Sequence, residues 1–188
     1  MVIIITGTRK GIGKELAEYF IADGHQVIGC SRGEASIESP NYEHHSLDIT
    51  NEIAIKTFYS QMRKKYGRLD VLINNAAVNN ALAPIALVSY NAAASTMNTN
   101  FMGSFLMSRE AIKLMMKNSF GRIVNMGSMA VKYEEKGEAI YTASKAAVLA
   151  MTKIMAKEVF QYGITCNAVS PSAIKTDLMD NIDPDALN

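Results

Sequence analysis

A short apolar run that leads directly into a glycine-rich turn constrains this chain more than any other feature. Residues 2–5 are continuously apolar and β-branched, which is typical of a central parallel strand covered on both faces. The turn that follows, residues 6–13, reads TGTRKGIG, and apolar side chains at helical spacing come after it. A strand, a glycine turn and a helix in this order predict the first unit of a doubly wound α/β sheet.

Strand and helix patterns alternate along the rest of the chain. The first helix is expected to carry Ile12 and to end with Gly24 as its C′ residue, and a second to run from a cap at Thr50 or Asn51 to Gly67. Further strands are expected at residues 26–30, 46–48, 70–74, 121–126 and 164–169, and further helices at residues 88–99, 101–117 and 141–161. Strands separated by helices predict right-handed βαβ units in a Rossmann-type, doubly wound parallel sheet.

The composition is that of one soluble globular domain covering residues 1–188. Hydrophobic residues make up 48% and charged residues 20%, and the net charge of +1 comes without a basic stripe, which argues against nucleic-acid binding. The apolar runs are shorter than the about 18 residues of a membrane span, and no signal peptide is evident. Cys30 and Cys166 are interpreted as reduced thiols, so we expect a cytoplasmic protein without a metal site.

The end of the sequence has the pattern of a helix start that is not completed. Asp183 and Pro184 resemble an N-cap followed by proline in the first helical turn, yet the sequence stops at Asn188. A helix this short is not stable alone. Either this end is disordered or a C-terminal part is missing from the sequence, and we expect the second.

The glycine turn is the first candidate binding site. Its glycines would let the backbone turn tightly and approach a pyrophosphate, and the helix N-terminus would supply N–H groups and a partial positive charge. A plain strand-to-helix turn is the alternative interpretation. The candidate dinucleotide-binding residues are Gly7, Thr8, Arg9, Lys10, Gly11, Ile12 and Gly13.

The spacing TGxxxGxG, in place of the common GxGxxG, resembles the glycine motif of the short-chain dehydrogenase/reductase family. The TGxxGxxG spacing of that family's longer epimerase and dehydratase branch is absent. The resemblance runs from residue 2 to residue 176 and includes members that act as 3-oxoacyl-ACP reductases. It implies an NAD(P)-dependent oxidoreductase that transfers a hydride between nicotinamide and a carbonyl or secondary alcohol.

Further cofactor positions are implied by this resemblance. Asp48, followed by Ile49 in LDIT, matches the aspartate that contacts the adenine ring. Asn75 and Ala76 belong to NNAA, which stands where the family has Asn-Asn-Ala-Gly, a segment that lies along the adenine ribose. Ala77 replaces the usual glycine of that segment.

The segment after the last predicted strand matches the one that reaches the nicotinamide carboxamide. Pro171, Ile174 and Thr176 are its candidate cofactor contacts. Ser172 replaces the usual glycine and would be strained if that position required a positive φ.

The residues after the second strand indicate which nicotinamide cofactor is bound. An acid there would bind the ribose 2′-hydroxyl of NAD, whereas a basic residue accommodates the 2′-phosphate of NADP. Here Ser31 and Arg32 follow the strand, no acid occurs before Glu34, and Lys10 stands where NADP-preferring members often have a basic residue. Each cation could instead be a solvated surface residue, but together they favour NADP(H).

The catalytic group is predicted from Tyr141 and Lys145, which stand four residues apart and therefore on one face of a helix. Reduction of a carbonyl needs a proton on oxygen as hydride reaches carbon. A free tyrosine has a pKa of about 10, and a lysine ammonium one turn away is expected to lower the tyrosine pKa. Alone, the pair is a weak signal.

Two further residues complete the catalytic group by resemblance. Ser128 lies 13 residues before Tyr141 and matches the serine whose hydroxyl hydrogen-bonds the reacting carbonyl. Asn100 matches the asparagine that interrupts a helix and holds a water against the lysine, completing a proton relay. Asn98 is the other candidate for that role, but the spacing to Gly103 favours Asn100.

Other features give alternatives and partners. His44 and His45 are adjacent in an expected strand and would point to opposite faces, so they are poor joint metal ligands. Charges at residues 132–138 are interpreted as a solvated loop, or alternatively as selecting a polar small-molecule substrate. By resemblance, helices in residues 88–117 and 141–161 pack against other subunits in a homodimer or homotetramer. The rival function is a regulatory or scaffold protein that binds the cofactor without turnover.

Overall fold

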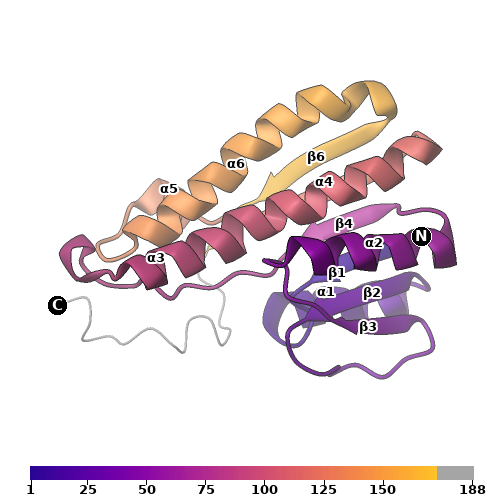
Figure 1. Ribbon diagram of the computed structural model, residues 1–188, viewed down its shortest axis with the longest axis horizontal. Helices are drawn as coiled ribbons and strands as arrows, with labels where there is room; N and C mark the ends of the chain where they lie inside the picture. Colours follow the sequence, from indigo (N-terminus) through magenta and orange to yellow (C-terminus); the bar gives the residue numbers. More distant parts are fainter. Residues whose placement is uncertain (173–188) are drawn as a thin grey trace.

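The computed structural model describes residues 1–172, in which helices connect the six parallel strands except between the second and the third, which a loop joins (Figure 1). The strands are β1 (Val2–Thr6), β2 (Gln26–Ser31), β3 (Tyr42–Ser46), β4 (Val71–Asn74), β5 (Gly121–Met126) and β6 (Ile164–Val169). The helices are α1 (Gly11–Ala22), α2 (Glu52–Tyr66), α3 (Tyr90–Met97), α4 (Ser104–Met115), α5 (Ala130–Tyr133) and α6 (Ala139–Val159).

The strand order is β3-β2-β1-β4-β5-β6, and every neighbouring pair is parallel. The chain builds outward from β1 to β3, then returns to the other side of β1 and builds outward again to β6. In such sheets, ligands bind beyond the carboxyl ends of the strands where the order reverses, here between β1 and β4. The predicted Rossmann-type parallel sheet is confirmed, and the glycine turn lies at this switch point.

Two apolar layers hold the sheet between helices. Ile4 packs with side chains of α2, α4 and α6 on one face, while Ile3 and Ile5 pack with Ala17 of α1 on the other. All three isoleucines are fully buried. Because alternate strand residues enter opposite layers, a strand covered on both faces must be apolar throughout. This explains the continuous apolar run at the start of the chain.

Helix ends follow the sequence signals closely. Gly24 follows α1 with φ +77°, as expected of a C′ residue. The Asn51 side chain accepts a hydrogen bond from the Ala54 N–H, so Asn51 and not Thr50 caps α2, and Gly67 ends that helix with φ +69°. The long helix α6 begins at Ala139, before the expected residue 141, and a short 3₁₀ turn follows it before Gly163.

The expected position of the third strand was wrong. It is Tyr42–Ser46 and not residues 46–48, because its ladder with β2 ends where β2 itself ends at Ser31. The two helices expected in residues 88–117 are present as α3 and α4, and a π-helical turn, Asn98–Gly103, joins them without a break. The π turn shifts the helical register at Asn100 while preserving backbone hydrogen bonding.

Within residues 1–172, no helix has both the length and the apolar character needed to cross a membrane.

Candidate active site

Glycine is required at three positions of the turn after β1. Gly7 and Gly11 have φ values of +76° and +56°, a region that favours glycine. At Gly13, an added Cβ would collide with the Gly7 carbonyl oxygen and with the side-chain amide of Asn75. Gly13 therefore lets α1 pack closely against the end of β1, which is the role of the third glycine in dinucleotide-binding turns.

Asn75 fixes this turn to the carboxyl end of β4. Its Nδ2 donates to the Thr6 carbonyl at 2.9 Å and to the Gly7 carbonyl at 3.3 Å. The backbone N–H groups of Asn75 and Ala76 donate to Thr6 Oγ1 at 3.0 and 2.9 Å. The NNAA segment thus supports the glycine turn directly. Thr6 has a structural role that the glycine pattern did not reveal.

The start of α1 is suited to an anion. No side chain caps this helix, and its first turn contains no acidic residue. Its leading N–H groups therefore carry the partial positive charge of the helix dipole without a competing carboxylate. Lys10, at the N-cap position, and Arg9 are both exposed beside it. These residues fit the pyrophosphate of a dinucleotide.

The segment after β2 lies against the glycine turn. The Ser31 hydroxyl donates to the Gly33 carbonyl at 3.1 Å, and the Ser36 hydroxyl donates to the Arg9 carbonyl at 2.8 Å. The Arg9 side chain passes over Gly33. Arg32 is exposed in this segment. The structure therefore gathers basic side chains from both segments at one rim of the sheet.

Asp48 and Ile49 differ in their surroundings. Asp48 is exposed, and its Oδ1 accepts from the backbone N–H and hydroxyl of Thr50 at 2.9 and 2.8 Å. Ile49 is buried in the layer beneath α4, where its side chain fills the space left by Gly103. A side-chain contact to a ligand is therefore open to Asp48, whereas the Ile49 side chain belongs to the core.

The catalytic candidates Ser128, Tyr141 and Lys145 lie together. Tyr141 and Lys145 occupy one face of α6 and are only 9% and 4% exposed. The half-buried Ser128 follows β5 and hydrogen-bonds the Tyr141 side chain. Lys145 Nζ donates to the Met126 carbonyl at 2.8 Å and lies 5.8 Å from the centre of the Tyr141 ring.

Burial controls the pKa values of this pair. It raises the pKa of Tyr141, with a further increase from the nearby Glu138 carboxylate that the Ser128 hydrogen bond opposes. It lowers the pKa of Lys145 from 10.5 to about 8. The expected lowering of the Tyr141 pKa is therefore not found, because desolvation of the phenolate outweighs the favourable interactions.

Asn100 lies in the π-helical turn and is buried, whereas the alternative, Asn98, is exposed. Its Oδ1 accepts from the Val78 N–H at 2.8 Å, and its Nδ2 donates to the Val78 carbonyl at 2.9 Å and to Ser144 Oγ at 3.0 Å. The Ser144 hydroxyl donates in turn to the Tyr141 carbonyl at 2.6 Å. Asn100 thus links the segment after β4 to the first turns of α6. Sequence reasoning did not identify Ser144, which stands inside the motif between Tyr141 and Lys145.

The segment after β6 contacts the residue that follows Ser128 of the catalytic group. The Pro171 carbonyl accepts from the Met129 N–H at 3.0 Å, directly after Ser128. Among residues 1–172, the non-glycine residues with positive φ are Ser119 and Glu134, so Ser172 does not have the positive φ that would strain a serine. Ile174 and Thr176 lie outside the described residues.

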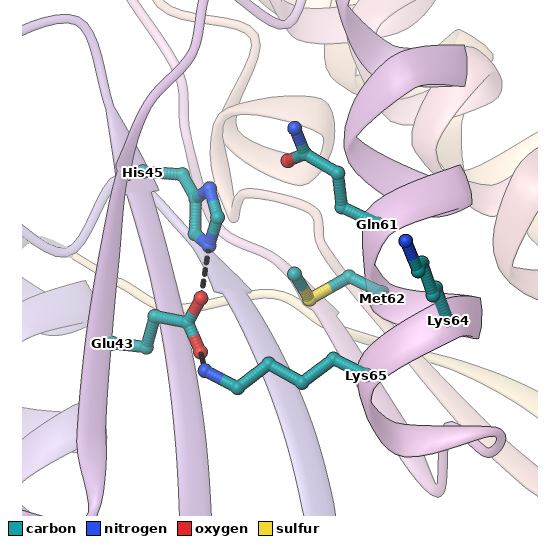
Figure 2. Close-up of a pocket in the computed structure, with 6 residues that line it drawn as sticks. All are labelled: Glu43, His45, Gln61, Met62, Lys64 and Lys65. Carbon is teal, nitrogen blue, oxygen red and sulfur yellow. Dashed lines mark hydrogen bonds and ion pairs between the residues drawn. The ribbon is translucent and has the colours of Figure 1, made fainter.

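A separate groove of about 420 Å³ lies between β3 and α2 and is lined by none of these residues (Figure 2). Glu43 is its central charge and bridges His45, at 2.8 Å, and Lys65, at 2.6 Å. Burial alone would raise the pKa of Glu43, but hydrogen bonds from Lys65, Tyr66 and His45 lower it to about 2. Within residues 1–172, no group of three or more His, Cys, Asp or Glu side chains could hold a metal ion.

Residues 1–187 match the family model described as short chain dehydrogenase. The chain belongs to the short-chain dehydrogenase family. It is therefore an oxidoreductase of the class that acts on CH–OH or C=O groups with a nicotinamide cofactor.

Relatives of this short-chain dehydrogenase agree with that assignment. It is 34% identical over 185 residues to the 3-oxoacyl-[acyl-carrier-protein] reductase FabG of Vibrio cholerae, covering 94% of this chain and 75% of that protein. It is similar to the structure of ElxO with NADP bound, at 33% identity and a TM-score of 0.90 over 97% of this chain and 77% of that one. It is also similar to 3-ketoacyl-(acyl-carrier-protein) reductase from Brucella melitensis complexed with NADH, at 26% identity and a TM-score of 0.91 over 96% and 79%.

Proposed function

We propose that this short-chain dehydrogenase is an NADP(H)-dependent carbonyl reductase in which Tyr141 is the general acid. The convergence of Ser128, Tyr141 and Lys145 at the carboxyl end of β5 carries the proposal. The glycine turn follows the carboxyl end of β1, and in a parallel sheet these ends share one edge. A dinucleotide at the turn would therefore extend toward the catalytic group.

The chemistry follows from the protonation state of Tyr141. Because burial raises its pKa, the phenol keeps its proton at neutral pH, as a proton donor must. The Ser128 hydroxyl hydrogen-bonds the substrate oxygen and polarises the C=O bond. When bound, the nicotinamide supplies the hydride that forms the new C–H bond. As the C=O π pair moves to oxygen, the Tyr141 proton forms the O–H bond and a phenolate remains.

Lys145 and Asn100 support the proton donor. The Lys145 ammonium stabilises the phenolate and, by family resemblance, holds the nicotinamide ribose. Asn100 fixes the first turns of α6 through Ser144. By family resemblance, it also holds a water against Lys145 and so completes the relay that returns a proton to Tyr141. In the oxidation direction, the same groups act in reverse, with Tyr141 as general base.

The charge at the adenosine end supports NADP(H) over NAD(H). Arg32 follows β2 where an acid would bind the ribose 2′-hydroxyl, and Lys10 lies across the same rim. Asp48 is the candidate for the adenine ring, Asn75 and Ala76 for the ribose, and Pro171 with Ile174 and Thr176 for the carboxamide.

Substrate and assembly follow from the relatives and the surface. Relatives named as 3-oxoacyl-ACP reductases make 3-oxoacyl thioesters the first carbonyl substrates to test. Exposed apolar side chains on the helices, including Tyr90 and Ile154, support the homodimer or homotetramer that the family resemblance implies. Cys30 and Cys166 are buried free thiols, which supports a cytoplasmic location.

The test is NADPH consumption with 3-oxoacyl thioesters and simple ketones, comparing the wild type with Tyr141→Phe. Loss of the proton donor is expected to lower kcat by about 10²- to 10⁴-fold, while NADPH affinity measured by calorimetry stays the same. Tyr133→Phe removes an exposed hydroxyl and serves as the matched control. Unchanged turnover in Tyr141→Phe, or binding of NADPH without turnover of any carbonyl, contradicts the proposal and favours the scaffold role.

A further inference from the structure

A chain of side-chain hydrogen bonds connects the glycine turn to the segment after β2 by way of the edge strand β3. Thr8 Oγ1 lies 2.8 Å from the Tyr42 hydroxyl oxygen, which lies 3.1 Å from His44 Nδ1. On the other side of the imidazole, His44 Nε2 lies 2.9 Å from the Gly33 carbonyl oxygen. We call Thr8, Tyr42, His44 and Gly33 the β3 bridge.

The bridge has one consistent direction when the imidazole is neutral. The Gly33 carbonyl can only accept, so His44 Nε2 carries the proton and donates to it. His44 Nδ1 then accepts from the Tyr42 hydroxyl, whose oxygen accepts from Thr8. Every polar atom in the bridge has a partner of the correct kind. Such fully satisfied chains hold their members in one geometry.

The sheet leaves room for the bridge at one glycine. Gly29 of β2 pairs with His44 of β3, and an added Cβ at Gly29 would collide with both the Tyr42 and Thr8 hydroxyls. Thr8 is fully buried. The hydroxyl pair therefore occupies a space that any larger residue at Gly29 would fill.

We propose that Tyr42 and His44 are positioning residues for the adenosine 2′-phosphate of NADP(H), an inference that rests on the proposed function. The bridge joins Thr8, directly before Arg9 and Lys10, to Gly33, directly after Arg32. It thereby fixes the separation between the basic side chains of the two segments. A phosphate held by cations from both segments needs that separation, whereas an adenosine without a 2′-phosphate does not.

The opposite face of β3 offers a matched comparison. Glu43 and His45 point toward α2, where Glu43 accepts from Lys65 (Figure 2). Glu43 also accepts from the Tyr66 hydroxyl. Tyr66→Phe therefore removes a tyrosine hydroxyl bonded to β3, as Tyr42→Phe does, but leaves the bridge intact. Any effect common to both variants reports only on the stability of the edge strand.

The experiment measures binding of adenosine 2′,5′-bisphosphate and of 5′-AMP by calorimetry, so it does not depend on turnover. Tyr42→Phe and His44→Leu are expected to weaken binding of the bisphosphate by about 5- to 10-fold, the loss of one or two net hydrogen bonds, and to leave 5′-AMP within about twofold. His44→Gln restores a donor near the place of Nε2 and is expected to recover part of the affinity. In turnover assays, Tyr42→Phe and His44→Leu are expected to raise KM for NADPH and to leave kcat the same.

The outcomes separate this inference from the proposed function. A wild type that binds the two nucleotides equally overturns the NADP(H) assignment and this inference with it. A wild type that prefers the bisphosphate, with Tyr42→Phe and His44→Leu keeping that preference, overturns this inference alone. Equal losses of bisphosphate affinity in Tyr42→Phe and Tyr66→Phe also overturn it, as do equal losses of affinity for both nucleotides in Tyr42→Phe. In either case the bridge would only stabilise the fold.

Discussion

Lys145 Nζ lies 5.8 Å from the centre of the Tyr141 ring, one helical turn away, and is anchored to the Met126 carbonyl at 2.8 Å. The position is favourable for a phenolate and unfavourable for the lysine itself. Burial lowers the pKa of Lys145 to about 8, so its charge is held against a desolvation cost. The free energy of unfolding should therefore vary with pH as Lys145 titrates, and this can be measured in the absence of substrate.

Lys145→Met is expected to change how the free energy of unfolding varies with pH. Between the folded pKa of about 8 and the ordinary value of 10.5, the unfolded chain holds a proton on Lys145 that the folded chain has lost. Because the unfolded state binds more protons, the Lys145 contribution to stability rises with pH across this window. The stability of the wild type relative to Lys145→Met should increase by about 3 kcal/mol from pH 8 to 10.5, as measured by urea unfolding.

The control for this prediction is Lys153→Met, on an exposed position of the same helix. Titration of the buried tyrosines and cysteines that lie away from Lys145 affects both variants alike and cancels in the comparison. A wild-type advantage that stays constant with pH would contradict the lowered pKa of Lys145.

Glu138 stands directly before α6 and raises the pKa of Tyr141 through its negative charge. Glu138→Gln is therefore expected to lower the Tyr141 pKa. Since carbonyl reduction requires the protonated phenol, the alkaline limb of the kcat/KM profile should move to lower pH, by less than about one pH unit because solvent reaches the partly exposed Glu138 and screens its charge. The Glu138 side chain makes no cap hydrogen bond to α6, so the substitution leaves the helix start intact.

Glu134→Gln, an exposed position in the same segment, is the comparison for that measurement. If both variants shift the alkaline limb equally, the effect is one of net charge and not of Glu138 acting on Tyr141.

The parts of this fold that follow from local physics could be predicted from the sequence. A strand buried on both faces must be apolar throughout, as Ile3, Ile4 and Ile5 are, and a turn that packs without Cβ atoms must be glycine, as Gly13 is. Ser128, Tyr141 and Lys145 were identified by family resemblance, and the structure places them together.

Other parts depend on tertiary packing that leaves little trace in a sequence. The edge strand β3 is polar because Glu43 accepts hydrogen bonds from Lys65 of α2 and from His45, so its residues lack the apolar alternation of a strand. The direction of the Tyr141 pKa shift also depends on how deeply the ring is buried. The four-residue spacing indicates that the Lys145 ammonium can attract a Tyr141 phenolate, but it does not indicate the desolvation of that phenolate, which raises the pKa.

Gly13→Ala is expected to damage both the fold and the cofactor site. The new Cβ would collide with the Gly7 carbonyl and with Asn75 Nδ2, two groups that fix the glycine turn. Relieving this overlap should lower the free energy of unfolding by about 1–3 kcal/mol. Because the turn must move, NADPH affinity measured by calorimetry should fall at least about tenfold.

Gly24→Ala separates these two effects. Its φ of +77° makes alanine strained, but nothing lies within 4 Å of the new Cβ and the site is at the other end of α1. It should lower the stability by about 1 kcal/mol without changing NADPH affinity. An equal loss of affinity in both variants would show that stability, and not the shape of the turn, limits binding.

Arg32→Asp is expected to reverse the cofactor preference. An acid directly after β2 can accept from the ribose 2′-hydroxyl of NADH, whereas it repels the 2′-phosphate that Arg32 would bind through charged hydrogen bonds. KM for NADPH should rise at least about tenfold, the loss of one such bond, and KM for NADH should change far less. Arg63→Asp, an exposed position on α2, makes the same change in net charge away from the cofactor rim. Both substitutions alter the long-range attraction for the dinucleotide equally. Only a local contact with the 2′-phosphate therefore predicts that Arg32→Asp, unlike Arg63→Asp, raises KM for NADPH more than KM for NADH. An equal rise in both KM values with Arg32→Asp would contradict that contact.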